Sequence, residues 1–191
     1  AMLLAIDTST NHASLALLGD AQPTASYGWP VGQNHSVEIF TELERLLAQT
    51  GTRGRITALA VATGPGSFNG TRVAVTVAKT LAFVWQVPLV GVTTLDGMAQ
   101  AALASPASAI VLAEPGGTLL AALEAGRDEL YICWYDLKAR SLQAPDAPPA
   151  FVAPRGAMQL ATVDQIVAAA PMGRILACGN LTDMHRTALT E

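Results

Sequence analysis

Apolar and polar positions alternate along the chain in short blocks that predict strands and helices in turn. Residues 2–7, Met-Leu-Leu-Ala-Ile-Asp, form a near-continuous apolar run that ends in an acid. Such a run is typical of a central strand buried on both faces. Two more apolar runs follow closely, at 13–18 and 24–29, with Gly19-Asp20 between them. This spacing predicts an antiparallel meander of three strands.

Two helices of different character follow in the first half. Residues 34–49 carry their apolar side chains on one face and most of their charges elsewhere, which predicts an amphipathic helix. Residues 71–85 are apolar nearly all round, with Arg72 and Lys79 as the charges. A helix without a polar face is buried inside the protein or against another chain. Because a short chain has difficulty burying such a helix alone, the pattern favours a subunit interface.

The remaining pattern repeats itself after a Ser-Pro-Ala-Ser linker at 105–108. A strand, a strand, a strand, a helix and a strand recur in the same order, which predicts an α/β fold of two duplicated mixed-sheet halves, 1–106 and 107–191. The other strands expected are 56–63, 88–92, 109–113, 119–125, 130–135, 151–153 and 174–177, and the other helices expected are 94–104 and 157–170.

A glycine loop at 64–72, Gly-Pro-Gly-Ser-Phe-Asn-Gly-Thr-Arg, joins the strand 56–63 to the apolar helix. It does not match the phosphate loop, because Pro65 stands where the first glycine belongs and no lysine follows Gly70. It also fails the dinucleotide fingerprint, because Asn69 replaces the third glycine. The sequence therefore favours a tight strand-to-helix connection over a phosphate-binding loop.

Asp7, Thr8 and Ser9 follow the first strand, where a carboxylate and two hydroxyls could hold a metal and a phosphate. The same residue types are common in hairpin turns, because their side chains bond to nearby backbone groups. We favour the structural interpretation of this turn.

Composition narrows the function. The chain is 51% hydrophobic and 14% charged, with a mean hydropathy of +0.36, so much of it is buried or part of its surface meets a partner. No apolar run approaches the roughly 20 residues of a membrane span, and no signal peptide is predicted. Cys133 and Cys178 lie in apolar runs and are expected to be buried thiols in a reducing cytoplasm. The net charge is −4, and the basic residues do not cluster in the sequence. We therefore do not expect the chain to bind nucleic acid alone.

Over nearly its whole length the sequence resembles the bacterial TsaB family, also called YeaZ, of tRNA threonylcarbamoyladenosine biosynthesis proteins. The resemblance is carried mainly by the glycine loop 64–72. It departs modestly at Asn69, where threonine is usual, and at 125–127, where Asp-Ala-Arg is usual. The other matching segments are Leu-Ala-Ile-Asp-Thr-Ser-Thr at 4–10, Asn-His-Ser at 34–36, Gly-Val-Thr-Thr-Leu at 91–95 and Ala-Gly-Arg-Asp-Glu-Leu-Tyr at 125–131.

The resemblance implies an actin-like ATPase fold, which is related to ribonuclease H. It also implies a non-catalytic scaffold that docks to and activates the catalytic paralogue TsaD during formation of N6-threonylcarbamoyladenosine in tRNA. The ATPase TsaE joins that complex, tRNA is bound only through it, and the lone subunit is expected to be a cytoplasmic homodimer. No cofactor is required, but the resemblance allows ATP or ADP at the partner interface, contacted by Asp7, Thr8, Ser9 and Arg72.

The expected partner surface combines the first helix with the apolar helix after the glycine loop. Its predicted residues are Phe40, Leu43, Leu47, Phe68, Val73, Val77 and Leu81.

A metal site is not expected. The catalytic paralogue carries Asn-His-x-Glu-Gly-His, whose two histidines share one helical face and grip one metal ion. Here Thr94 and Met98 occupy those positions, and a hydroxyl and a thioether are poor ligands for such an ion. The histidines, His12, His35 and His185, are not spaced to replace them.

The sequence therefore predicts no catalytic residues, and it supports neither the older glycoprotease label nor transferase chemistry. The alternative is an autonomous actin-like ATPase or phosphotransferase that uses Asp7, Thr8 and Ser9.

Overall fold

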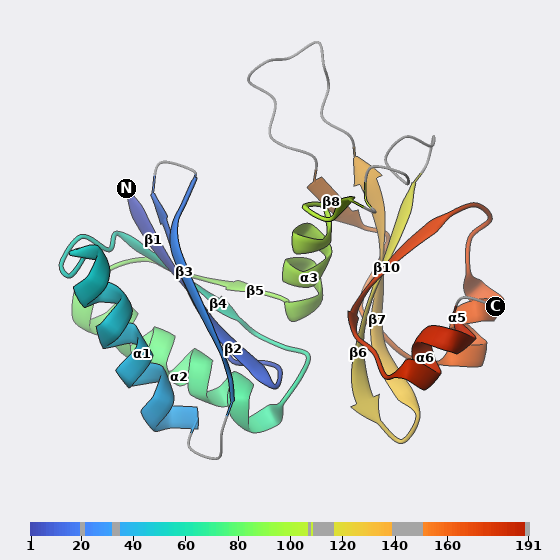
Figure 1. Cartoon of the computed structure of the whole chain (residues 1–191), viewed down its shortest axis with the longest axis horizontal. Coiled ribbons are helices and arrows are strands. Elements are labelled where there is room, and N and C mark those ends of the chain that lie inside the picture. The colour runs from blue at the N-terminus through green and yellow to red at the C-terminus, as the bar shows by residue number, and fades with distance from the viewer. Residues whose placement is uncertain (20–21, 32–34, 107, 109–116, 139–150, 190–191) are drawn as a thin grey trace, which may run out of the picture. The chain divides into compact units, whose positions relative to one another are not determined.

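The computed structural model describes residues 1–19, 22–31, 35–106, 108, 117–138 and 151–189, and the chain divides into two compact units, Ala1–Thr94 and Leu95–Glu191 (Figure 1). The predicted boundary at Pro106 was twelve residues too late. Helix α3 (Thr94–Ala102) is the reason, because its Leu95 and Ala99 are buried in the core of the second unit.

The first unit has a described sheet of five strands in the order β3-β2-β1-β4-β5. The meander β1–β2–β3 is antiparallel, as predicted, and β1, β4 and β5 run parallel. Asp20 of the predicted turn and Asn34, the predicted start of the first helix, lie outside the described residues. The elements are β1 (Met2–Asp7), β2 (His12–Gly19), β3 (Gln22–Pro30), α1 (His35–Thr50), β4 (Ala58–Ala62), α2 (Phe68–Trp85) and β5 (Leu89–Val92).

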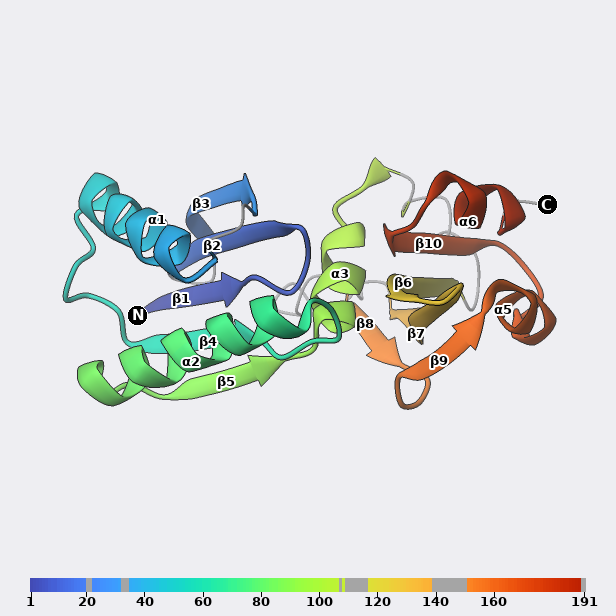
Figure 2. The same cartoon turned by 90° about the horizontal axis from the view of Figure 1, so that it is seen from below.

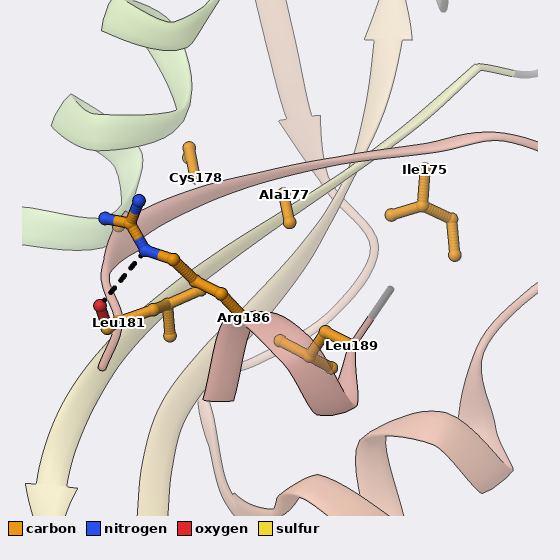
Figure 3. Close-up of a pocket in the computed structure, with 7 residues that line it drawn as sticks. Ile175, Ala177, Cys178, Leu181, Arg186 and Leu189 are labelled. Carbon is orange, nitrogen blue, oxygen red and sulfur yellow. Dashed lines mark hydrogen bonds between the residues drawn. The ribbon is translucent and has the colours of Figure 1, made fainter. Parts of the chain in front are cut away.

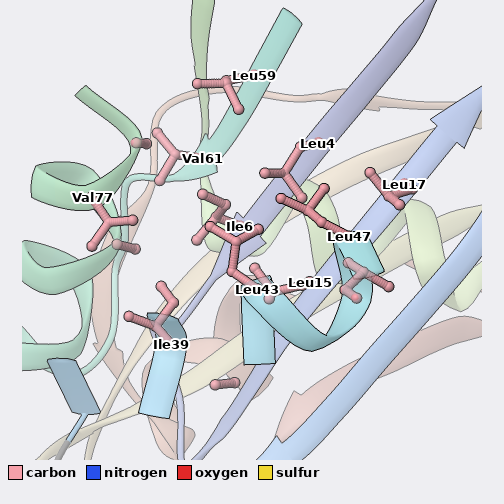
Figure 4. Close-up of a cluster of buried hydrophobic side chains, with 14 of the residues drawn as sticks. Leu4, Ile6, Leu15, Leu17, Ile39, Leu43, Leu47, Leu59, Val61 and Val77 are labelled. Carbon is pink, nitrogen blue, oxygen red and sulfur yellow. The ribbon is translucent and has the colours of Figure 1, made fainter. Parts of the chain in front are cut away.

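The core of the first unit lies between one face of this sheet and the helices α1 and α2 (Figure 4). Alternate strand residues point to that face because side chains alternate along a strand. The central buried side chains are Leu4, Ile6, Leu15, Leu17, Leu59 and Val61 from the strands, Ile39, Leu43 and Leu47 from α1, and Val77 from α2.

The second unit repeats this topology. Its sheet has the order β10-β6-β7-β8, with β9 also paired to β7. Strand β7 is antiparallel to β6 and β10 is parallel to β6, as β2 and β4 are to β1. The predicted fold of two duplicated mixed-sheet halves is therefore confirmed, although the expected strand 109–113 lies outside the described residues. The elements are β6 (Thr118–Gly126), β7 (Glu129–Lys138), β8 (Phe151–Pro154), β9 (Gln159–Thr162), α5 (Val163–Ala169), β10 (Ile175–Asn180) and α6 (Asp183–Ala188).

Helices cover both faces of the second sheet, with α3 on one side and α5 on the other (Figure 2). The central strand β6 is buried on both faces from Thr118 to Leu123, which explains its unbroken apolar sequence. Cys133 is buried and Cys178 is partly buried, close to the prediction for both thiols.

The predicted helix 157–170 was wrong in its first half. Residues 159–162 form β9, which pairs with β7. The helix begins only after Thr162, whose hydroxyl accepts a hydrogen bond from the Gln165 backbone while the Gln165 side chain accepts one from the Thr162 backbone. This capping box fixes the start of α5. Helix α6 was not predicted.

A partly buried hydrogen bond joins α3 to the second sheet. The hydroxyl of Tyr135, a fully buried side chain on β7, donates to Asp96 Oδ1 at 2.8 Å. Burial, the hydrogen bond to Asp96 and the neighbouring Cys133 thiol raise the pKa of Tyr135 above its ordinary value of 10.0. The phenol is therefore held in its neutral, donating form.

Replacing Tyr135 by phenylalanine should lower the free energy of unfolding by about 1–3 kcal/mol, because Asp96 loses its buried donor. Because the folded-state pKa of Tyr135 is raised, its contribution to stability is fully present below pH 10 and is lost progressively above that pH, so the difference between wild type and Tyr135→Phe should shrink there. Urea unfolding at pH 8 and pH 10.5 measures both effects.

Tyr131→Phe is the control, because the Tyr131 hydroxyl has no hydrogen bond among the described residues. Equal losses in the two variants, or a loss that grows above pH 10, would contradict the assigned role of Tyr135.

Candidate functional site

The glycine loop packs directly on the turn that follows β1. The Ser67 backbone N–H donates to Ser9 O at 2.7 Å, and the Thr8 hydroxyl donates to Gly70 O at 2.7 Å. Ser67 also caps α2, since its hydroxyl accepts from the Gly70 N–H at 3.2 Å. These bonds set the start of α2 against the end of β1.

Two glycines make this approach possible. A Cβ atom on Gly66 would lie 2.0 Å from Ser9 O, and one on Gly70 would lie 2.0 Å from Thr8 O. No side chain fits at either position, because real Cβ atoms do not approach an oxygen so closely. Gly66 also has φ +147°, a conformation that L side chains rarely adopt. Backbone of the β1–β2 turn therefore occupies the space in front of these glycines.

Asp7 and Arg72, two of the predicted nucleotide contacts, each have a partner within the first unit. Asp7 Oδ1 accepts hydrogen bonds from the Ser9 N–H at 2.8 Å and the Ser9 hydroxyl at 2.6 Å, so this oxygen holds the turn. The Arg72 guanidinium lies over the Phe68 ring, with its carbon 5.1 Å from the ring centroid. The arrangement is that of a structural turn with a cation–π pair on the adjoining helix.

The two positions that would carry metal ligands in TsaD are occupied by packed side chains. Thr94 is 2% exposed, and its N–H donates to Gly64 O at 2.8 Å. Met98 packs against the core of the second unit. Within the described residues, no group of three or more His, Cys, Asp or Glu side chains could hold a metal ion. Among all the residues that the structure describes, no helix is long and apolar enough to cross a membrane.

The outward face of α2 carries a row of exposed residues, here called the α2 stripe. Phenylalanines stand at both ends, 73% and 77% exposed, with two cations between them. The spacing of three or four residues places these side chains on one helical face. The α2 stripe consists of Phe68, Arg72, Thr76, Lys79 and Phe83.

The predicted partner surface is only partly exposed. Phe40 and Phe68 reach the surface, whereas Leu43, Leu47 and Val77 are core residues, only 3%, 3% and 6% exposed. Their place in the partner surface is therefore corrected, because a partner cannot contact side chains that the first unit has already buried. Val73 and Leu81 are partly buried against the same core.

The predicted partner surface included Phe68 of the α2 stripe but not Thr76, Lys79 or Phe83, and Arg72 was predicted only as a nucleotide contact. The spacing of Phe68, Arg72, Thr76, Lys79 and Phe83 was the available signal. Two cations on one helical face make burial in a protein core unfavourable, whereas aromatic residues and arginine are enriched at protein–protein interfaces.

Comparison with known proteins identifies this architecture. YeaZ from Pseudomonas aeruginosa superimposes with a TM-score of 0.76 at 26% identity, covering 94% of this chain and 76% of that one. The protein is an α/β protein of the actin-like ATPase fold, related to ribonuclease H. A family model described as TsaD, tRNA N6-adenosine threonylcarbamoyltransferase, matches residues 30–188.

Sequence relatives narrow the class. The tRNA threonylcarbamoyladenosine biosynthesis protein TsaB of Escherichia coli is 35% identical over 134 residues, which are 70% of this chain and 54% of that protein. TsaB of Bacillus subtilis is 37% identical over 98 residues, 51% of this chain and 43% of that protein. The chain belongs to the TsaB (YeaZ) family, as its sequence motifs predicted. The matched part spans about half the length of these curated relatives.

Gly70→Ala should destabilise the first unit by about 1–3 kcal/mol, because its new methyl group would collide with Thr8 O. Gly97→Ala on α3 is the matched control, since no atom lies within 4 Å of the added Cβ, and it should be neutral or stabilise by about 0.5–1 kcal/mol. Thermal and urea unfolding measure both. A neutral Gly70→Ala would show that the loop and the turn are not in direct contact.

Asp7→Ala should lower the free energy of unfolding by about 1–3 kcal/mol, because two hydrogen bonds in the turn are lost. Asp7→Asn retains an acceptor oxygen and should stay near wild type, both in urea unfolding and in tRNA modification reconstituted with a TsaD-family enzyme. A carboxylate that acts in catalysis would give the opposite result: normal stability and lost activity in Asp7→Asn.

Proposed function

We propose that this chain is a non-catalytic subunit for the formation of N6-threonylcarbamoyladenosine in tRNA, and that it docks to a TsaD-type catalytic subunit through the α2 stripe. The relatives named TsaB support the reaction. The packed Thr94 and Met98, in place of the histidines of the catalytic paralogue, support a subunit without its own metal chemistry.

The exposure of Phe68 and Phe83 is the main observation that supports this docking surface. Two phenyl rings left in water at the ends of one helical face favour burial against a partner. Arg72 and Lys79 between them favour an acidic strip on that partner. Phe40 on α1 is also exposed, by 48%, and we include it in the proposed surface.

The same surface serves a homodimer when the catalytic subunit is absent, so the two assemblies compete. TsaE would join the complex afterwards. The complex as a whole binds tRNA, because this chain has a net charge of −4 and its basic residues do not cluster in the sequence. A bound ATP or ADP would need contacts from the partner, since the Asp7 turn and the glycine loop fill their own space. The proposed setting is the cytoplasm.

Phe83→Asp should weaken binding to a TsaD-family protein at least tenfold, which corresponds to about 1.4 kcal/mol, because an aromatic anchor becomes a charge. Reconstituted tRNA modification should fall in parallel at limiting subunit concentration. Phe83 is a better target than Val77, since aspartate at buried Val77 would disrupt the core itself.

Met172→Asp is the control, because Met172 is fully exposed in the second unit. It should bind and support modification as wild type does. Unchanged binding of Phe83→Asp by calorimetry and light scattering would refute the docking surface. ATP hydrolysis by the isolated chain that persists through purification would instead support the autonomous ATPase.

A further inference from the structure

We draw no further inference here: the strongest candidate, a pocket of about 470 Å³ lined by residues of β10 and α6 (Figure 3), carries nothing, because nothing in the structure shows what covers it.

Discussion

Direct backbone contact between the glycine loop and the β1–β2 turn is the constraint on which the first unit depends. Gly66 and Gly70 lack the atom that would separate Ser67 and α2 from Ser9 and Thr8. The start of α2 is thereby fixed at the end of β1, and the buried face of the helix, around Ala74, follows from that anchor. The glycine loop resembles a phosphate-binding loop in sequence, but here it packs against the β1–β2 turn of the same chain.

The orientation of α2 in turn decides what the surface offers. Because Ala74 and its neighbours face the sheet, the opposite face presents two phenyl rings and two cations to solvent. The helix is thus neither fully buried nor an ordinary amphipathic helix. Its inward face stabilises the first unit, and its outward face is the proposed docking surface.

Duplication gave the two units one sheet topology, but helix length gives them different surfaces. The long α1 and α2 fill the face of the first sheet, whereas the short α5 and α6 leave a pocket of about 470 Å³ beside β10 in the second. In the segment after β5, the Thr94 N–H donates to Gly64 O of the glycine loop and Met98 packs against the core of the second unit. Packed side chains thus occupy the two positions at which the catalytic paralogue carries its metal-binding histidines.

The sequence by itself determined most of the strands, the repeat, the family and the missing ligand pair, because alternation, turn residues and motif spacing are local properties. It did not determine which face of α2 is buried, since Val77 and Phe83 are equally apolar and only contact with the sheet separates them. The boundary after Thr94 and the strand β9 also required tertiary structure. Both depend on pairing with a distant sheet, through Leu95 and Ala99 for α3 and through β7 for β9.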